Sequence, residues 1–370
     1  MANIIYPNYD KSLLSIISSL KKYFNEQYPY ASNEKIDELL NTDKYNHITF
    51  MILDGLGSKV LEDNLDDEKL LNKRHVDDLI SIYPSTTAAA TTSAISGLTP
   101  LESGWTGWQN YVKEINQNIV LFTGVNYFTN KQTNITGYQI LPYAPFWQSF
   151  PIYTSRIMPP FDKHNGVKNF NSGIKKLKKI WKTKEASFTY FYWTEPDSTM
   201  HSFGCDCSKS HKVINDLNKK VEQLYNNLPS DSLVIITADH GHINVEPINL
   251  TLDLKLNSML KRRPSNDARA ITFFVLDDKK VEFVKHFNEL YKDYYTLYEA
   301  EEFINKGFLG DTSKSKINPR IKDFLGDYIA VAISNKYFEY NDYFAGFKSH
   351  HAGMTSEEMV TPLIIINKWF

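Results

Sequence analysis

Cysteine is scarce in this sequence, with Cys205 and Cys207 as the two among 370 residues. The pair lacks the C-x-x-C spacing of a zinc knuckle, so we expect free thiols and no disulfide framework. No apolar run approaches the roughly 20 residues that a membrane span needs. The N-terminus lacks a basic segment followed by a continuous apolar core, which is the pattern of a secretion signal. The sequence therefore predicts a cytoplasmic protein without membrane association.

An excess of positive charge is also lacking. Lysine and arginine number 41 against 43 aspartates and glutamates, which gives a net charge of −2. Such a balance provides no basic field for a nucleic-acid polymer or an anionic membrane. Hydrophobic residues make up 42% of the chain and charged residues 23%, as in ordinary globular proteins. The length allows one large domain, or a large domain with a smaller insert.

Two apolar segments end abruptly in groups that bind metals. Leu233–Thr237 is suited to a buried strand and is followed by Asp239 and His240. Ile48–Leu53 is similar and is closed by Asp54. In open α/β sheets, sites lie at the carboxyl ends of the strands, and mixed oxygen and nitrogen ligands suit a divalent metal, zinc first. Taken singly, each segment reads equally well as a strand that ends in a polar turn.

A third segment adds a carboxylate and an imidazole. The aromatic strand predicted over residues 186–193 runs into Asp197 and His201, which are four positions apart. On one helical turn they face the same side and can share a metal ion. The simpler interpretation is a helix-capping aspartate and a surface histidine.

Residues 82–100 predict a small-residue helix whose N-terminus suits an anion. Pro84 precedes Thr86 and Thr87 at the predicted helix start, and Gly97 ends the helix. Free backbone N–H groups and the positive end of the helix dipole favour a negatively charged ligand there. A hydroxyl at that position is either an N-cap or a nucleophile. Trp105 and Trp108 follow in a glycine-containing loop, where they either pack in the core or cover an apolar leaving group.

The remaining segments suggest the domain organisation. Residues 13–24 predict an amphipathic helix, and a charged helix is predicted between 57 and 81. Residues 252–340 change in character and predict a compact α+β cap insert. We therefore expect a metal-binding α/β core formed by 1–251 and 341–370, with 252–340 inserted into it.

The combined motifs resemble the type I phosphodiesterase/nucleotide pyrophosphatase family of the alkaline phosphatase superfamily. The resemblance implies an alkaline-phosphatase-like, mostly parallel central sheet flanked by helices. Its motifs cover almost the whole chain and are, in order, MILDGLG, YPSTTAAATTSAISGLTPLESG, WTEPDSTMHSFG, TADHG and HAGMTSEEMVTPLI.

The resemblance also implies roles for single residues. It implies two divalent ions, zinc or alternatively manganese, and a small-molecule phosphodiester or nucleotide substrate. Thr87 matches the family nucleophile by its distance from Gly97, and His351 rather than His350 begins the family's last motif. Hydrolysis would then proceed through a phospho-threonine intermediate, with two cations about 4 Å apart stabilising the attacking and leaving oxygens. One ion would be held by Asp197, His201 and His351, and the other by Asp54, Asp239, His240 and the Thr87 oxygen.

One departure from the family pattern concerns the substrate. The pyrophosphatases carry an asparagine three residues after the nucleophile, where this chain has Ala90. Thr91 and Thr92 are the candidates to replace its contact in part. A phosphomonoesterase or phosphonate hydrolase on the same core is therefore an alternative, although no lysine or arginine lies in 82–100. A non-catalytic metal-binding homologue is a third hypothesis, against which the complete ligand set argues.

Overall fold

The computed structural model describes residues 3–42, 45–341 and 346–368. The chain forms two compact units, each assembled from three separate segments. The first unit contains Met1–Pro7, Ile82–Tyr143 and Ile243–Met359, and the second contains Asn8–Ser81, Ala144–His242 and Val360–Phe370. Each unit has a six-stranded sheet of its own. Residues 252–340, which we predicted to be a cap insert, all lie within the first unit.

The sheet of the second unit is mostly parallel, as predicted. Its strand order is β2-β16-β7-β1-β6-β5. β7, β1, β6 and β5 run parallel to one another, whereas β16 runs antiparallel to both β7 and β2. The strands are β2 (His75–Ile80), β16 (Val360–Ile366), β7 (Ser232–Thr237), β1 (His47–Leu53), β6 (Ser187–Trp193) and β5 (Tyr153–Ile157).

The register of the central strands brings their carboxyl ends to one edge. Leu53 at the end of β1 is paired with Trp193 at the end of β6, and Ile52 is paired with Thr237 at the end of β7. β1 and β7 are buried along their whole length, as expected of parallel strands covered on both faces. The residues that follow these three strands therefore leave the sheet side by side.

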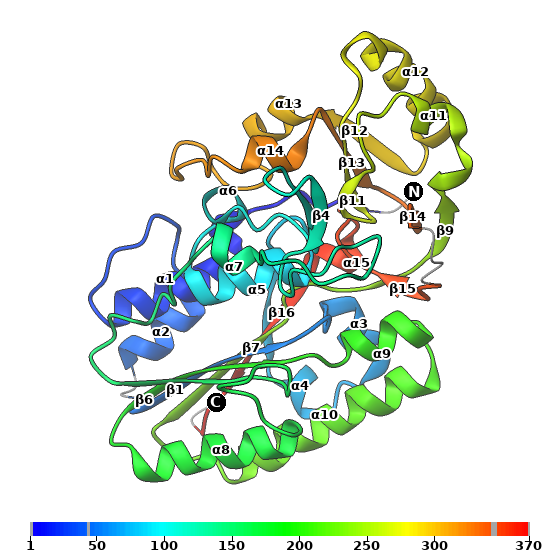
Figure 1. The fold of residues 1–370 in the computed structure, drawn as a ribbon. Helices are drawn as coiled ribbons and strands as arrows, with labels where there is room; N and C mark the ends of the chain where they lie inside the picture. Colours follow the sequence, from blue (N-terminus) through cyan, green and yellow to red (C-terminus); the bar gives the residue numbers. More distant parts are fainter. Residues whose placement is uncertain (1–2, 43–44, 342–345, 369–370) are drawn as a thin grey trace. The chain divides into compact units, whose positions relative to one another are not determined.

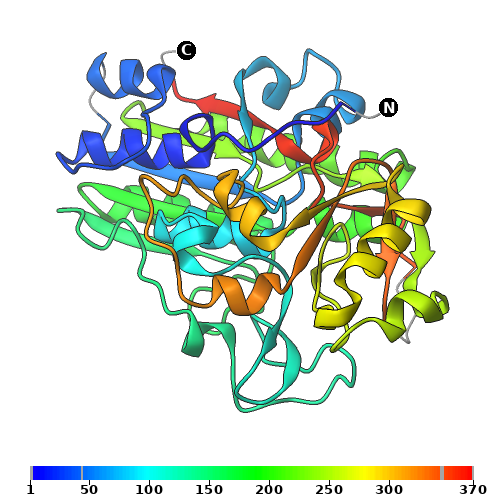
Figure 2. The same ribbon diagram turned by 90° about the horizontal axis from the view of Figure 1, so that it is seen from above.

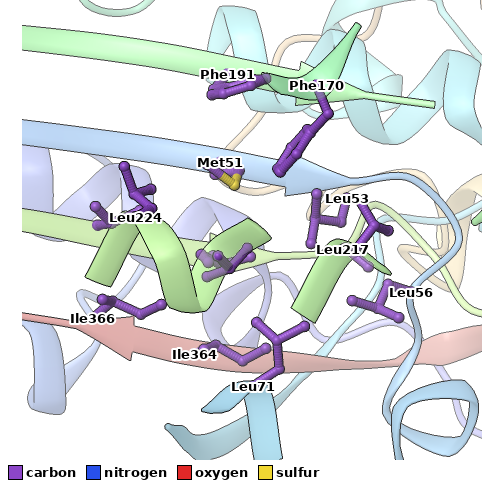
Figure 3. Packing of buried hydrophobic residues seen from close by; sticks show 14 of the residues in the cluster. Met51, Leu53, Leu56, Leu71, Phe170, Phe191, Leu217, Leu224, Ile364 and Ile366 are labelled. Carbon is purple, nitrogen blue, oxygen red and sulfur yellow. The ribbon is translucent and has the colours of Figure 1, made fainter. Parts of the chain in front are cut away.

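Helices cover both faces of this sheet. α8 and α10 lie on one face, and α1 and α2 lie on the other (Figure 1). Apolar side chains of α8 and α10 meet Met51, Leu53 and Phe191 from the strands (Figure 3). Burying each such side chain contributes about 1.5–3 kcal/mol. The helices of the unit are α1 (Leu13–Tyr23), α2 (Glu34–Thr42), α3 (Ser58–Asn64), α4 (Leu70–Lys73), α8 (Phe170–Thr183), α9 (Asp197–Phe203) and α10 (Ser208–Asn226).

The charged helix expected up to residue 81 is only partly present. Two short helices, α3 and α4, are followed by the strand β2 at the edge of the sheet. The helical interpretation of 75–80 was wrong because an edge strand tolerates the charges of this segment, which faces one neighbour only. The predicted N-terminal helix is confirmed, since α1 buries Leu13, Leu14, Ile17 and Leu20.

The first unit contains an antiparallel sheet of order β12-β13-β11-β10-β3-β4. Phe283 and Phe287 of α12 pack on Phe273 of this sheet, so α12 covers one of its faces (Figure 2). The strands are β3 (Gln109–Val112), β4 (Gln117–Val120), β10 (Ser265–Asp267), β11 (Ala270–Phe273), β12 (Tyr295–Glu299) and β13 (Tyr328–Ala332), and two further pairs join β8 (Ile243–Asn244) to β15 (Ser349–His350) and β9 (Glu246–Asn249) to β14 (Lys336–Glu339).

The helices of the first unit are mostly short. They are α5 (Thr87–Ser96), α6 (Pro100–Ser103), α7 (Gly137–Ile140), α11 (Leu254–Ser258), α12 (Lys280–Tyr291), α13 (Ala300–Asn305), α14 (Ile321–Leu325) and α15 (Ser356–Met359). α5 has the predicted extent, and Gly97 ends it in the left-handed conformation, with φ of 73°. Within the residues that the structure describes, no helix is both long enough and apolar enough to cross a membrane.

Candidate metal centre

Two aspartates enter the second unit's interior from the ends of neighbouring strands. Asp54 directly follows β1, and Asp239 lies two residues beyond β7. Asp54 is 2% exposed and Asp239 is fully buried. The pairing of β1 with β7 thus places two carboxyl groups at one buried edge, as the sequence predicted for this segment pair.

His240 completes a first cluster with these carboxylates. The potential ligand atoms of Asp54, Asp239 and His240 all lie within 4.8 Å of one another. His240 Nε2 is 3.4 Å from Asp54 Oδ1 and 3.7 Å from Asp239 Oδ2. The other ring nitrogen, Nδ1, lies 3.0 Å from the carbonyl oxygen of Gly241. A backbone contact of this kind orients the ring of a metal-binding histidine.

The carboxylate oxygens of this cluster are short of hydrogen-bond donors. Among the described residues, neither Asp54 Oδ1 nor Asp239 Oδ2 has a hydrogen-bond partner. The other oxygens are engaged, since Tyr192 donates to Asp54 Oδ2 and the Gly55 N–H donates to Asp239 Oδ1 at 3.1 Å. A buried carboxylate oxygen without a partner is costly, and a divalent cation would compensate both charges. The donor set of oxygens and one imidazole fits such an ion.

The charges also change the pKa of the groups in this cluster. Burial, and then the nearby carboxylates of Asp239 and Asp197, raise the pKa of Asp54 well above its usual range. Burial and the neighbouring Asp54 likewise raise the pKa of the Tyr192 hydroxyl. The repulsion between the buried carboxylates shows that this site has an excess of negative charge.

A second cluster lies on α9 and the loop after β7. Asp197 and His201 are four residues apart on α9, and His201 Nε2 is 3.3 Å from Asp197 Oδ1, which confirms the predicted shared face. His242 Nε2 is hydrogen-bonded to the same oxygen at 2.6 Å. Burial alone would raise the pKa of Asp197, but His201 and His242 lower it well below its usual range. Burial lowers the pKa of His242 to about 4.

The sequence analysis did not assign His242. In this unit its ligand atom lies within 4.8 Å of those of Asp197 and His240, so it belongs to the cluster. The signal was present in the sequence as His-Gly-His after a buried strand, because two histidines separated by one residue can face one site.

Glycines let the two strand-end loops approach each other. A Cβ on Gly57 would lie 2.5 Å from the Cα of Gly241, which no side chain could tolerate. Gly55 has a φ of 74° and faces His242 and Asp197, whose atoms would lie 2.9 and 3.0 Å from an added Cβ. Close contact of the backbone after β1 with the backbone after β7 therefore depends on these glycines.

Thr87 and His351, the other two predicted ligands, belong to the first unit. Thr87 is the first residue of α5, and the N-cap position is held by Thr86, whose side chain makes no capping hydrogen bond. His351 Nδ1 is 3.1 Å from the carbonyl oxygen of Ser85, and the Ser85 hydroxyl donates to the carbonyl of Gly353 at 2.8 Å. The loop before Thr87 and the loop that carries His351 are thus joined within this unit.

The three residues considered for substrate contact differ in exposure. Trp105 is fully buried, and its indole N–H donates to the carbonyl oxygen of Leu141 at 3.0 Å, so it packs in the core of the first unit. The hydroxyl of Thr91 donates to the carbonyl of Thr87 within α5 at 2.6 Å. Trp108 is 41% exposed and has surface available for a ligand. Cys205 and Cys207 form no disulfide, as predicted.

Comparison with solved structures shows the fold. Murine ectonucleotide pyrophosphatase/phosphodiesterase 5 is 17% identical, with 85% of this chain and 87% of that chain covered and a TM-score of 0.63. An inactive variant of the murine protein in complex with AMP gives 16% identity, 87% coverage of both chains and the same TM-score of 0.63. Phosphonoacetate hydrolase from Sinorhizobium meliloti 1021, in complex with phosphonoformate, is 14% identical over 88% of this chain and 90% of that chain, with a TM-score of 0.61.

Comparison by sequence shows the family. No curated protein matched the chain. The family model described as type I phosphodiesterase / nucleotide pyrophosphatase matches residues 49–350, which include all four predicted metal-ligand segments before His351 and end next to that residue. The family and fold that the motifs indicated are both confirmed. The chain therefore belongs to the type I phosphodiesterase/nucleotide pyrophosphatase family, whose members are metal-dependent hydrolases.

Proposed function

We propose that the protein is a two-metal hydrolase of phosphodiester or pyrophosphate bonds in small molecules, with Thr87 as nucleophile. The observation that carries the proposal is a pair of buried carboxylate oxygens beside His240, Asp54 Oδ1 and Asp239 Oδ2, which have no hydrogen-bond partner within the described part of the chain. A site with this excess of buried negative charge is suited to divalent cations and then to an anionic phosphoryl group.

The proposal assigns one ion to Asp54, Asp239 and His240 and the other to Asp197 and His201. By the resemblance, Thr87 would join the first set of ligands and His351 the second. When bound, the ions would neutralise charge on the phosphoryl oxygens and favour the ionised form of the threonine hydroxyl. We propose zinc as the native metal, because the ligand set mixes imidazole and carboxylate, with manganese as the alternative.

The chain's own residues would position the reaction. The Thr87 oxygen would attack phosphorus in line with the leaving oxygen, so that one P–O bond forms as another breaks. Thr87 is the first residue of α5, so the free backbone N–H groups at this helix N-terminus would stabilise the negative charge that develops during attack. Water would then cleave the threonine–phosphorus bond and restore the free hydroxyl.

A phosphonate or monoester substrate is the second candidate. Ala90 favours it. This residue is fully buried on α5, at the position where the diesterases have an asparagine. The contact that this asparagine makes with the phosphoryl group would therefore be missing. The solved structures of phosphonoacetate hydrolase have the same fold. We propose that residues 252–340 influence which of these substrates is accepted, and that the protein acts in the cytoplasm.

The test is a hydrolysis screen of the zinc-loaded protein with matched substrates. Each aryl phosphodiester is compared with the corresponding monoester and with phosphonoacetate, with Thr87→Ala as the control for the nucleophile. Turnover of diesters above monoesters and phosphonates, abolished in Thr87→Ala, is the expected result. Preference for phosphonoacetate would establish the second candidate instead, and no turnover of any substrate by the zinc- or manganese-loaded protein would disprove hydrolysis.

A further inference from the structure

His242 is a buried histidine at the metal centre to which the family resemblance gives no role. Its side chain is fully buried, and its ring is held on several sides. The ring is 4.8 Å from the His201 ring and 5.6 Å from the His240 ring, measured between centroids. Gly55 closes another side, because even a Cβ there would lie 2.9 Å from the His242 ring. The ring therefore has little freedom to turn away from the cluster.

The position of its Nε2 atom suggests coordination rather than simple packing. His242 Nε2 and His201 Nε2 both point to Asp197 Oδ1, at 2.6 and 3.3 Å. Two imidazole nitrogens and one carboxylate oxygen are donors of the types that catalytic zinc sites use. The two rings meet at 78°, so their nitrogens approach from different directions, as separate ligands do.

We propose that His242 is a ligand of the ion held by Asp197 and His201. This proposal rests on the metal centre of the proposed function. Asp197, His201 and His242 all belong to the second unit. That unit alone would then supply three protein ligands to this ion, the number that catalytic zinc sites commonly use. The ion would bind before His351 contributes, and the loss of His351 would weaken binding without abolishing it.

The competing explanation is that His242 positions Asp197 through the 2.6 Å hydrogen bond and never touches the ion. The variants His242→Ala and His242→Gln separate the two roles. Glutamine keeps an N–H near the former Nε2 and can still donate to Asp197, but it is a poor zinc ligand. The measurements are metal content and zinc affinity, determined by competition with a chromophoric chelator, with circular dichroism to verify that each variant is folded.

We expect His242→Ala and His242→Gln alike to retain the ion at Asp54 and to lose at least about 100-fold in affinity for the other, beyond the effect typical of indirect partners. Binding restored by glutamine would assign His242 a positioning role, and unchanged binding in the alanine variant would exclude any role at the metal. Either result would overturn the proposal. The effect in Asp239→Asn, which removes a ligand of the other ion, should be limited to that ion.

A spectroscopic measurement covers the case in which the alanine variant does not fold. Zinc X-ray absorption of Asp239→Asn, whose remaining ion is the one at Asp197, counts the imidazoles bound to a single site. We expect the zinc ion in Asp239→Asn to bind one more imidazole than the zinc ion in the double variant Asp239→Asn/His242→Gln. An equal number of bound imidazoles would contradict the proposal. Zinc binding that depends on His242 in a protein without hydrolase activity would disprove the proposed function and leave this inference intact.

Discussion

Arg269 and Glu358 form a fully buried, bidentate ion pair in the first unit. Arg269 Nε donates to Glu358 Oε1 at 2.6 Å, and Nη2 donates to Oε2 at 2.7 Å. The same carboxylate accepts the Gly353 N–H at 2.7 Å and the Thr355 hydroxyl at 2.8 Å. Arginine from the β10–β11 hairpin thus fixes the loop that follows His351, a link that composition and periodicity do not indicate.

Removing the charge of Glu358 should therefore affect both stability and the His351 loop. We expect Glu358→Gln to cost about 3–5 kcal/mol in the free energy of unfolding, because Arg269 would be left as an uncompensated buried charge. Urea unfolding measures the loss. The double variant Arg269→Met/Glu358→Leu removes both charges and should recover part of the stability but not the bonds to Gly353 and Thr355. A single variant as stable as the original protein would show that the pair contributes nothing.

Metal analysis tests the two clusters. The original protein should bind about two divalent ions per chain, since the donors form two groups of the size that zinc sites need. His201→Ala and Asp239→Asn should each lose one ion and almost all activity. Glu246→Gln, a change at an exposed ion pair of the first unit, is the control and should retain both ions. Full occupancy in both cluster variants would disprove the assignment.

The size of the effect of Thr87→Ala on stability and on rate should show whether Thr87 is a nucleophile or only caps the helix. Loss of a cap costs about 1 kcal/mol in stability and leaves chemistry intact, whereas loss of a nucleophile typically lowers the rate by several powers of ten. Thr87→Ala should stay folded and metal-bound but almost inactive, and Thr87→Ser should keep partial activity. Acid trapping and peptide mapping should locate the phosphoryl group on Thr87. An adduct on Thr86 would show that the neighbouring hydroxyl is the nucleophile.

Gly57→Ala should disturb the metal centre without changing any ligand. The added methyl would overlap the Gly241 backbone, and a backbone atom can give way only if the two loops separate. We expect weaker zinc binding at Asp54 and Asp239. The free energy of unfolding should fall by at least about 1 kcal/mol, as it does in overpacked cores, and the Tm should fall with it. Gly307→Ala is the control for backbone strain alone, since Gly307 has a positive φ, of 73°, but an added Cβ would meet the Gly310 carbonyl oxygen at an ordinary contact distance of 3.6 Å. Zinc affinity unchanged in Gly57→Ala would show that the loops are adaptable.

The His75–Asp78 pair predicts a pH-dependent term in stability. The hydrogen bond that His75 donates to the Asp78 carboxylate raises the pKa of His75 and lowers the pKa of Asp78. The contribution of His75 is complete below its unfolded pKa of about 6.5 and is lost as the pH rises through the raised folded value. The contribution of Asp78 is complete above about pH 3.9 and is lost as the pH falls through the lowered value.

His75→Gln should accordingly lower the unfolding free energy at about pH 5.5 more than at about pH 9. The difference should be below about 1 kcal/mol because Asp78 is partly exposed to solvent. Urea unfolding at the two pH values measures it, and Asp78→Asn should show the same dependence. A larger loss at the higher pH would contradict the assignment.

Local sequence patterns predicted the residues that lie next to a strand or within one helical turn. An apolar strand followed directly by a carboxylate identified Asp54 and Asp239, and the spacing of one helical turn identified Asp197 with His201. His242 was not assigned, because its place two residues after His240 does not by itself indicate its contact with Asp197, 45 residues away. The strand β2 was missed for a similar reason, since its hydrogen-bond partner β16 lies almost at the other end of the sequence.

The place of β16 between β2 and β7 has a consequence for biosynthesis. Among the strands that the structure describes, β2 has β16 as its one neighbour in the sheet. Residues 75–80 therefore have no such strand to pair with until residues 360–366 have left the ribosome. Throughout translation, the apolar edge of β7 is likewise open to pairing with other chains. The closing step joins segments far apart in sequence, which makes it slow. Until β16 emerges, the nascent chain therefore presents two open strand edges, those of β2 and β7.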